Sequence, residues 1–439
     1  MPKYPLSLLL MLARIINWST GVKGEATAIH FPCARRLQFV DLGCWFFSKH
    51  CAYRCAHARN AIQNDLHRLC NNSTLDTLDL ILTHLHADHY SLAPLIPHCC
   101  NSSKVNAVNI YIPGIPHKPP EVRDVALKLL VLEYIALKTI ARSVREALKP
   151  IVEWLESAHV MSRAIMLYSG NTVDIGGGMY IWVVWPPEEF PLEEKLRRKI
   201  EELNERYNEI VKLLKEVCKR GKEQELFKEL CKDVENIKKT VERLRNNLEE
   251  LHRNKEKEKG YVTVPPDSDL AKYLLPTITY PPPFDIYYYY PELELIMMAL
   301  LKISDALNDF SLILEYYYIN KPIIVIPGDN SDDVLNYVGD LEKKIIDIVG
   351  ININVRDVVF LRGAHHGTHY GEYLSLFKPG VTWLSEYEPN CNNKNTFQYR
   401  HEYWGDMSVF PNLVITARNA VKTEVEIDNL STWRVHVYG

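Results

Sequence analysis

The sequence predicts an α/β fold into which an antiparallel pair of long helices is inserted. Three observations support this prediction. Short apolar runs alternate with helical patterns along most of the chain, which is typical of layered α/β domains. Residues 191–259 depart from this alternation because more than half of them are charged. Finally, a dense group of histidine and aspartate side chains directly follows one apolar run, where α/β folds commonly carry their functional residues.

The individual elements follow from hydrophobic periodicity and from turn residues. The first apolar run, Leu8–Ala13, ends at Arg14, is short for the core of a signal peptide and is expected to form a short helix. Longer patterns predict helices at Ala58–Cys70, Glu121–Ser157, Pro291–Leu307 and Asp332–Val349. Strands are expected at Ala26–Phe31, Leu37–Asp41, Leu78–Thr83, Val108–Ile112, Tyr180–Trp185, Ser311–Tyr317, Ile323–Pro327, Val358–Leu361, Thr382–Ser385 and Leu413–Thr416.

The charged segment carries a heptad pattern in each of its halves. In the first half, apolar residues recur from Leu196 to Val217 at alternating steps of four and three, and the second half repeats this from Phe227 to Leu251. Gly221, the only glycine of the segment, provides a turn between them. We therefore expect an antiparallel coiled-coil hairpin whose apolar seams face each other and whose arms project about 40–45 Å. Its charges are expected to form solvated faces, or else to grip a partner or a long substrate.

This pattern divides the chain into three parts. Residues 1–187 and 263–439 are expected to form the two halves of one core, and residues 188–262 the inserted hairpin. The hairpin leaves and rejoins the core near the expected metal-binding loops, so it could select substrates or form a homodimer.

Composition narrows the class of protein. The net charge of -4 gives no overall attraction to nucleic acid, so binding of a polyanion would need a local basic patch or metal ions. Arg362, Lys378, Lys394 and Arg400 could form such a patch. The ten cysteines contain no Cys-x-x-Cys pair and are expected to be buried or surface thiols in a reducing compartment, with disulfides between loops as the alternative. The protein is expected in the cytoplasm. No membrane-spanning segment is expected, because Lys128 and Glu133 interrupt the longest apolar stretch.

The segment His84-Leu85-His86-Ala87-Asp88-His89 carries the strongest functional signal. It holds four side chains that can bind metal, directly after an apolar strand. Burying three imidazoles and a carboxylate together is costly unless a metal ion pairs them. His84 and His86 alternate and can face one ion, while Asp88 and His89 can face a second. The sequence therefore predicts a metal site here.

This His-x-His-x-Asp-His segment resembles the signature of metallo-β-lactamase-fold hydrolases. Other motifs follow in the order of that family: Asp41-Leu42-Gly43 after a strand, Gly328-Asp329 after another, and His365-His366-Gly367-Thr368 towards the end. The last motif and Asn308-Asp309-Phe310-Ser311 are similar to the ComEC-like hydrolase domain of the DNA-uptake channel protein and its stand-alone relatives. The resemblance runs from about Gly21 to the C-terminus, apart from the hairpin.

The resemblance implies an αββα sandwich and a site with two divalent ions, Zn²⁺ or Mn²⁺. Asp329 would bridge the ions, and either His365 or His366 would be the last ligand. Asp41 and Asn308 would lie behind the ligands, with Asp41 orienting a ligand histidine. Asp88 and His366 would serve catalysis, Asp88 as a proton shuttle. His366 would donate a proton to the leaving oxygen or contact the substrate, or else it would lie behind the ligands and support them. The full set of implied metal ligands is His84, His86, Asp88, His89, Asp309, Asp329 and His365.

Three functions remain open on this basis. The first is a metal-dependent phosphodiesterase or nuclease that cleaves DNA or RNA through a metal-bridging hydroxide. The second is a hydrolase of a small phosphodiester, lactone or cyclic nucleotide, which a closed pocket beneath the expanded segment would favour. The third is a partner-binding protein with a degenerate site. All of the expected ligand positions hold competent residues, which favours an enzyme.

Overall fold

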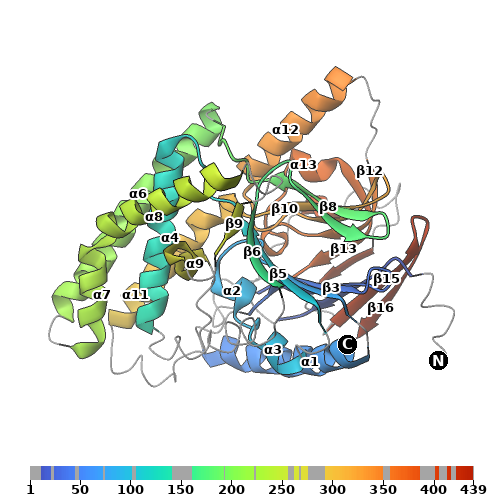
Figure 1. The fold of residues 1–439 in the computed structure, drawn as a ribbon, viewed down its shortest axis with the longest axis horizontal. Coiled ribbons are helices and arrows are strands. Elements are labelled where there is room, and N and C mark those ends of the chain that lie inside the picture. Colours follow the sequence, from blue (N-terminus) through green and yellow to red (C-terminus); the bar gives the residue numbers. More distant parts are fainter. Residues whose placement is uncertain are drawn as a thin grey trace.

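The computed structural model forms two β-sheets that pack face to face, with helices on their outer sides and a layer of long helices at one end (Figure 1). It describes residues 11–20, 24–44, 49–72, 75–100, 105–140, 161–191, 193–221, 224–255, 262–265, 268–274, 292–349, 356–385, 401–404, 413–416 and 422–438. The mixed α/β class predicted from the sequence is therefore confirmed.

The first sheet has nine strands in the order β16-β15-β1-β2-β3-β4-β5-β6-β9. Strands β3 to β6 are parallel, whereas the pairs on either side of them are antiparallel. Its strands are β1 (Ala13–Trp18), β2 (Ala26–Phe31), β3 (Arg36–Leu42), β4 (Thr77–Ile81), β5 (Ala107–Pro113), β6 (Met161–Leu167), β9 (Val262–Val264), β15 (Lys422–Asn429) and β16 (Thr432–Tyr438).

The second sheet has seven strands in the order β14-β13-β12-β11-β10-β8-β7. Strands β11 to β14 are parallel and the other pairs antiparallel. Its strands are β7 (Thr172–Gly176), β8 (Met179–Trp185), β10 (Ile313–Tyr318), β11 (Lys321–Ile326), β12 (Arg356–Arg362), β13 (Phe377–Leu384) and β14 (Leu413–Thr416).

The two sheets share one apolar core. Side chains such as Ile29 and Val40 of the first sheet join Val183 and Ile324 of the second in a single buried cluster. The inward alternation of β-branched residues along the strands explains this contact. The backbone N–H of Leu312 also donates to the carbonyl oxygen of Thr83 at 2.7 Å, which ties the two sheets together where β4 ends and β10 begins.

Helices cover the outer faces of both sheets. Helices α1 (Lys49–Asn72), α2 (Ala87–Tyr90) and α3 (Leu95–Cys99) lie on the first sheet, and α12 (Asp332–Val349) and α13 (Glu372–Ser375) on the second (Figure 1). Short 3-10 turns occur at η3 (Asn308–Phe310), η4 (His365–Gly367) and η5 (His401–Trp404). Among the described residues, no helix is long and apolar enough to cross a bilayer.

The charged segment forms three helices, α6 (Glu194–Arg220), α7 (Glu225–Glu235) and α8 (Ile237–Lys255), because the second arm breaks at Asn236. Their heptad positions, including Leu203, Leu214, Leu244 and Leu248, are buried. The seams of α6 and α7 meet next to the turn, but the expected coiled coil along the full length of both arms is not confirmed. Helix α6 packs against α4 (Pro120–Ile140) and α11 (Glu292–Leu307), whereas α8 packs against α4 and α9 (Asp269–Leu274).

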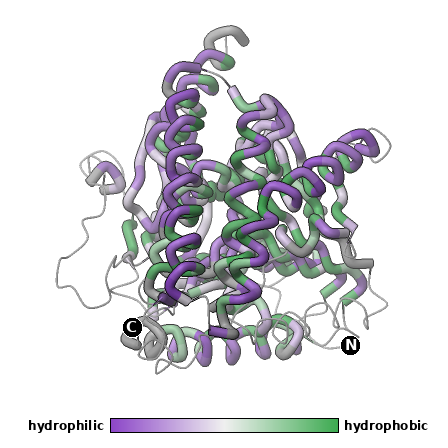
Figure 2. Tube along the Cα trace, turned by 90° about the vertical axis from the view of Figure 1, so that its left-hand side faces the viewer, coloured by the Kyte–Doolittle hydropathy of each residue, from purple (hydrophilic) through white to green (hydrophobic). Residues whose placement is uncertain are grey.

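The reason is that α4 and α11 also carry apolar faces that need cover, so the arms form a layer with them instead of projecting alone. Figure 2 looks at this layer and shows hydrophilic stretches on the helices in front and hydrophobic ones where the helices pack. The expected helix over Glu121–Ser157 is present up to Ile140, and its remainder lies outside the described residues.

The helix expected at Leu8–Ala13 lies outside the described residues up to Leu10, and its last residue, Ala13, begins a strand that was not predicted. Strand β1 at Ala13–Trp18 pairs with β2 and β15, which the sequence analysis could not foresee since its partner β15 lies about 400 residues away. The edge strands β7, β9 and β16 and the inner strands β6 and β15 were also missed. Helix α1 begins at Lys49, earlier than the predicted Ala58.

The expectation of free thiols is wrong for six cysteines. Folding brings Cys44 and Cys55, Cys70 and Cys100, and Cys218 and Cys231 to Cα separations of 5.7, 5.1 and 5.4 Å, and each pair forms a disulfide. Such separations suit a disulfide, and sequence spacing alone cannot reveal them. Cys99 is a buried free thiol in the described part of the chain.

Candidate metal centre

The predicted histidines and aspartates gather where the parallel strands of both sheets end. Asp41 ends β3, His84 follows β4, Asp329 follows β11, and His365 and His366 follow β12. Carboxyl ends of parallel strands meet at one edge of a sheet. Here these edges of the two sheets lie next to each other. This arrangement brings together side chains that lie up to 325 residues apart, from Asp41 to His366.

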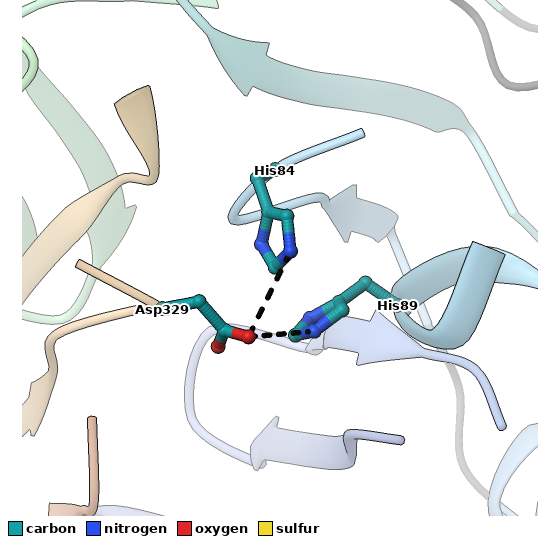
Figure 3. A group of neighbouring side chains, drawn as sticks. All are labelled: His84, His89 and Asp329. Carbon is teal, nitrogen blue, oxygen red and sulfur yellow. Dashed lines mark ion pairs between the residues drawn. The ribbon is translucent and has the colours of Figure 1, made fainter. Parts of the chain in front are cut away.

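One oxygen atom lies at the centre of the group. The Nε2 atoms of His84, His89, His365 and His366 lie 3.8, 3.4, 4.0 and 3.6 Å from Asp329 Oδ2. Figure 3 shows the Asp329 carboxylate pointing at His84 and His89, which approach from the loop after β4 and from α2. The distances exceed those of a hydrogen bond. Two ligand atoms that each lie about 2.1 Å from one tetrahedral ion lie about 3.4 Å from each other. The four distances to Asp329 Oδ2 are close to this separation.

Three overlapping sets of ligand atoms have a spacing that could hold an ion. They are His84, His89 and Asp329; Asp88, His89 and His366; and Asp329, His365 and His366. All of these side chains except His365 are buried. His84 Nε2, His89 Nε2 and Asp88 Oδ1 are buried without a hydrogen-bond partner, which is costly for polar atoms and fits atoms that serve as metal ligands. The donor set of imidazoles and carboxylates suits Zn²⁺ or Mn²⁺.

Electrostatics reinforce this grouping. Burial lowers the pKa of His84 well below its usual value, and the imidazoles of His89 and His86 act in the same direction. Burial would raise the pKa of Asp329, but the adjacent His89, His84 and His366 hold it well below its usual range. Burial opposes the charged form of His89, yet the carboxylates of Asp329 and Asp41 raise its pKa well above its usual value. Asp329 is therefore an ionised carboxylate among imidazoles.

Asp41 holds His89 from behind. Its Oδ2 lies 3.1 Å from His89 Nδ1, and its two oxygens accept hydrogen bonds at 2.8 Å from the backbone N–H and the hydroxyl of Thr83. This arrangement leaves Nε2 of His89 directed at Asp329. A carboxylate behind a ligand histidine fixes the orientation of the ring and raises its basicity.

The sequence analysis missed a matching arrangement behind His366. Nδ1 of His366 lies 3.0 Å from Ser385 Oγ and 3.2 Å from Glu25 Oε1, while Nε2 faces Asp329 and, at 3.9 Å, Asp88 Oδ2. Ser385 Oγ also donates to Glu25 Oε1 at 2.5 Å. Glu25 carried one faint signal, a lone carboxylate at the start of an apolar strand. Ser385 carried none.

Arg362 lies between the carboxylates of Asp41 and Glu25. The expectation that it belongs to a basic surface patch is wrong. Arg362 is 1% exposed, lies 2.7 Å from Asp41 Oδ2 through Nη2 and 3.2 Å from Glu25 Oε2 through Nε. The strand β12 directs it between the sheets, where the two carboxylates require a cation. Lys394 and Arg400 lie outside the described residues, and Lys378 is partly exposed.

The remaining predicted ligands lie at the border of the site. The structure does not bring Asp309 into any of the three sets. Instead its Oδ1 accepts a hydrogen bond from the N–H of Ser331 at 3.3 Å, and its Oδ2 lies 3.4 Å from Lys199 Nζ of α6. Asn308 is buried next to it in η3. His86 lies beside His84, with ring centroids 4.2 Å apart, but is also outside the three sets.

Backbone geometry holds these side chains in place. Asp41, His365 and His366 adopt left-handed conformations with φ of 58°, 44° and 60°, which are costly for residues with a Cβ and typical of functional sites. Gly43 allows close packing, because a Cβ there would lie 2.3 Å from the carbonyl oxygen of Asp88. Both His365 and His366 face Asp329, and His366 lies closer.

Comparisons with known proteins found no family model that matches this chain and no curated protein that is significantly similar to it.

Proposed function

We propose that the protein is a hydrolase that depends on two divalent metal ions and that its substrate is a phosphodiester. The observation that carries this proposal is the convergence of four imidazole Nε2 atoms on Asp329 Oδ2 at 3.4–4.0 Å. Asp329, His89 and His366 each belong to two of the three sets of ligand atoms, and this overlap suits two adjacent ions better than one.

The motif order supports a more specific hypothesis, a metallo-β-lactamase-type fold of the ComEC-like branch. Two facing sheets with helices outside are compatible with an αββα sandwich. The spacing of the His-x-His-x-Asp-His, Gly-Asp and His-His-Gly-Thr segments, and their position at the ends of parallel strands, support the same assignment. The inserted helices are an addition to that plan.

The chemistry follows from what the chain's own residues can do. His84, His89, His365 and His366 with Asp88 and Asp329 would hold the ions, which when bound supply an activated water and neutralise charge on the phosphoryl oxygens. Asp41 and the Glu25–Ser385 pair keep the Nε2 atoms of His89 and His366 directed inward. Asp88, whose Oδ1 lacks a hydrogen-bond partner, can accept a proton from the attacking water.

Small substrates are the second candidate, and one observation favours them over long polymers. A cavity beside His84 is roofed by helices α4, α9 and α11 and lined by apolar residues. Arg362 is buried and therefore does not belong to the expected basic patch, which weakens the case for a nucleic-acid groove. The proposal therefore covers a small phosphodiester as well as DNA or RNA.

The test is a cleavage assay with Mn²⁺ or Zn²⁺ on single- and double-stranded DNA, RNA and bis-p-nitrophenyl phosphate. Asp329→Asn should abolish cleavage and lower the metal content of the purified protein. Asp340→Asn, the same change on the exposed face of α12, should alter neither. Cleavage of polymer would establish a nuclease, and cleavage of the diester alone a small-molecule phosphodiesterase. Absence of both metal and cleavage in the unaltered protein would contradict the proposal.

A further inference from the structure

An apolar cavity lies directly beside the metal centre. It contains about 360 Å³ of space not filled by atoms, part of which is open to solvent. Among the described residues that line it, His84 is the only one with a polar side chain. The other lining residues come from the end of β5 and the loop after it, from α4, α9 and α11, and from η3. A ligand in this cavity would therefore meet apolar groups on every side except at His84.

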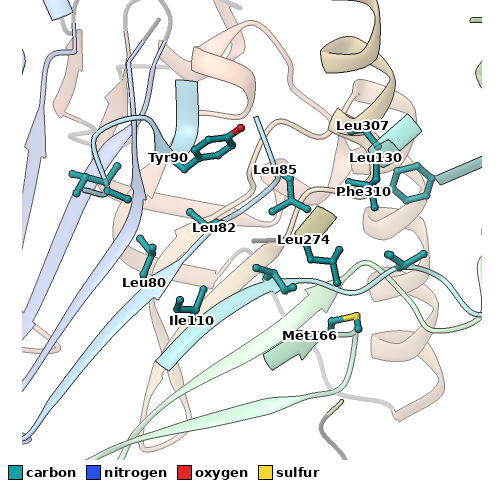
Figure 4. Packing of buried hydrophobic residues seen from close by; sticks show 14 of the residues in the cluster. Leu80, Leu82, Leu85, Tyr90, Ile110, Leu130, Met166, Leu274, Leu307 and Phe310 are labelled. Carbon is teal, nitrogen blue, oxygen red and sulfur yellow. The ribbon is translucent and has the colours of Figure 1, made fainter. Parts of the chain in front are cut away.

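The segment His84-Leu85 connects the cavity to the metal centre. Nε2 of His84 lies 3.8 Å from Asp329 Oδ2, whereas Leu85, the next residue, lines the cavity. Figure 4 shows Leu85 with Leu274 of α9 and Leu130 of α4 on the cavity side of it. Only one imidazole ring thus separates the cavity from the candidate metal ligands. A phosphoryl group bound at the metal centre would have an ester group within reach of the cavity.

One wall of the cavity, from Pro113 to Pro116, is rigid. Its two prolines have a fixed φ. The Tyr168 ring packs so closely on Gly114 that a Cβ there would lie 2.2 Å from it, and the Tyr168 hydroxyl donates to the carbonyl oxygen of Ile115 at 3.0 Å. Because this wall is already ordered, a ligand that binds against it loses little free energy in arranging it.

The lining favours an apolar ester group over the sugar and phosphate of a polynucleotide. The only polar side chain, that of His84, is already engaged, since Nε2 faces Asp329 and Nδ1 lies 3.2 Å from Thr83 Oγ1. A polar group in the cavity would lose its hydration without gaining a hydrogen bond, which is costly. Alkyl carbons would instead gain contacts that the empty cavity lacks and would leave water.

We propose that this cavity binds an apolar ester group of the substrate, so that the protein prefers phosphodiesters with an alkyl substituent to polynucleotides. This inference rests on the proposed phosphodiesterase function and names its substrate class. The phosphoryl group lies at the metal centre, and the alkyl group extends past His84 towards Leu85, Leu130 and Leu274. The selectivity comes from burial of apolar surface, so the length of the alkyl group is the variable to test.

The experiment measures kcat/KM for a series of alkyl p-nitrophenyl phosphates, which share the leaving group and differ in the second ester group. From methyl through ethyl and propyl to butyl, each methylene buried in the cavity should raise kcat/KM about fourfold. The 2-methoxyethyl ester has the length of the butyl ester but contains an ether oxygen, and it should lose most of this gain. Equal values along the series, or for the butyl and 2-methoxyethyl esters, would overturn the proposal.

Two substitutions in the cavity should shift the preference in opposite directions. Ala126→Leu adds carbons to the cavity lining and should remove most of the gain from methyl to butyl, whereas Leu130→Ala enlarges the cavity and should extend the gain to the hexyl ester. Ala136→Leu makes the first change at a buried position of the same helix that does not line the cavity, and it should leave the butyl-to-methyl ratio unchanged. Each ratio is taken within one variant, so partial loss of folded protein does not affect it.

A binding measurement separates this inference from the proposed function. In calorimetry with Zn²⁺-loaded protein, dibutyl phosphate should bind more tightly than dimethyl phosphate by about fourfold for each methylene that enters the cavity, and Ala126→Leu should remove this difference. Equal affinities, or cleavage of DNA or RNA in preference to the butyl ester, would overturn the assignment of the cavity. Failure to cleave any of the esters would instead overturn the proposed function on which the assignment rests.

Discussion

Replacing Arg362 tests whether the support behind the metal centre is electrostatic. Arg362 is 1% exposed and pairs with Asp41 at 2.7 Å and Glu25 at 3.2 Å. Arg362→Met keeps an unbranched apolar side chain but leaves two buried carboxylates without their cation. Removing one partner of a buried ion pair costs about 3–5 kcal/mol. We therefore expect the free energy of unfolding to fall by about that amount at pH 7.

The control has the same chemistry at the surface. Arg434 also pairs with two carboxylates, Glu426 at 3.1 Å and Asp428 at 2.9 Å, but its side chain is 50% exposed. Arg434→Met should cost less than about 1 kcal/mol, because water screens exposed pairs. Urea unfolding followed by circular dichroism gives both values. Equal losses in the two variants would refute the reasoning from burial.

The effect of Arg362→Met on the free energy of unfolding should depend on pH. Burial opposes ionisation of Asp41, but His89 and then Arg362 hold its pKa below the usual value. A carboxyl with a lowered pKa in the folded state contributes stability above its usual pKa of about 4, and this is lost as the pH falls through the folded value. Arg362→Met removes part of that contribution. The difference in unfolding free energy between variant and parent should therefore be greatest at pH 7 and shrink below about pH 4.

Three further predictions concern packing and metal. Gly43→Ala should lower metal affinity and thermal stability together, as calorimetry would show, because the new Cβ would lie 2.3 Å from the Asp88 carbonyl oxygen. Leu248→Ala in α8 should cost about 2–5 kcal/mol in urea unfolding, since Leu248 is fully buried, whereas Leu341→Ala at an exposed position of α12 should cost less than about 0.5 kcal/mol. Zn²⁺ added after chelation should raise the thermal midpoint of the parent but not of Asp329→Asn; equal rises would contradict the assigned ligands.

The residues of the candidate site were predictable because their chemistry is local in sequence. His84, Asp88 and His89 lie within one short segment after a strand, and no apolar core accommodates such a group cheaply. Asp329 and the His365–His366 pair were found only because they match motifs in a known order. Glu25 and Ser385 could not be found, since each is a single ordinary residue whose role exists only beside His366.

Arg362 shows the opposite error, and Asp309 lies outside the three sets of ligand atoms. Both were assigned from their position near a motif, Arg362 to a surface patch and Asp309 to a metal. Strand alternation sends Arg362 between the sheets, and Lys199 of the inserted helices draws the Asp309 carboxylate away from the three sets of ligand atoms. Neither partner is near in sequence, so no local pattern could indicate it.

The sequence by itself determined the α/β class, most of the central strands, the amphipathic helices and the residue types of the candidate metal site. These depend on short-range periodicity and on the side chains present. Only the tertiary structure decided which apolar faces pair, so that α6 lies against α4 and α11, and α8 against α4 and α9. It also decided the disulfide partners and the two carboxylates behind the histidines. All of these depend on contacts between residues far apart in the chain, where burial and charge are set by the whole fold.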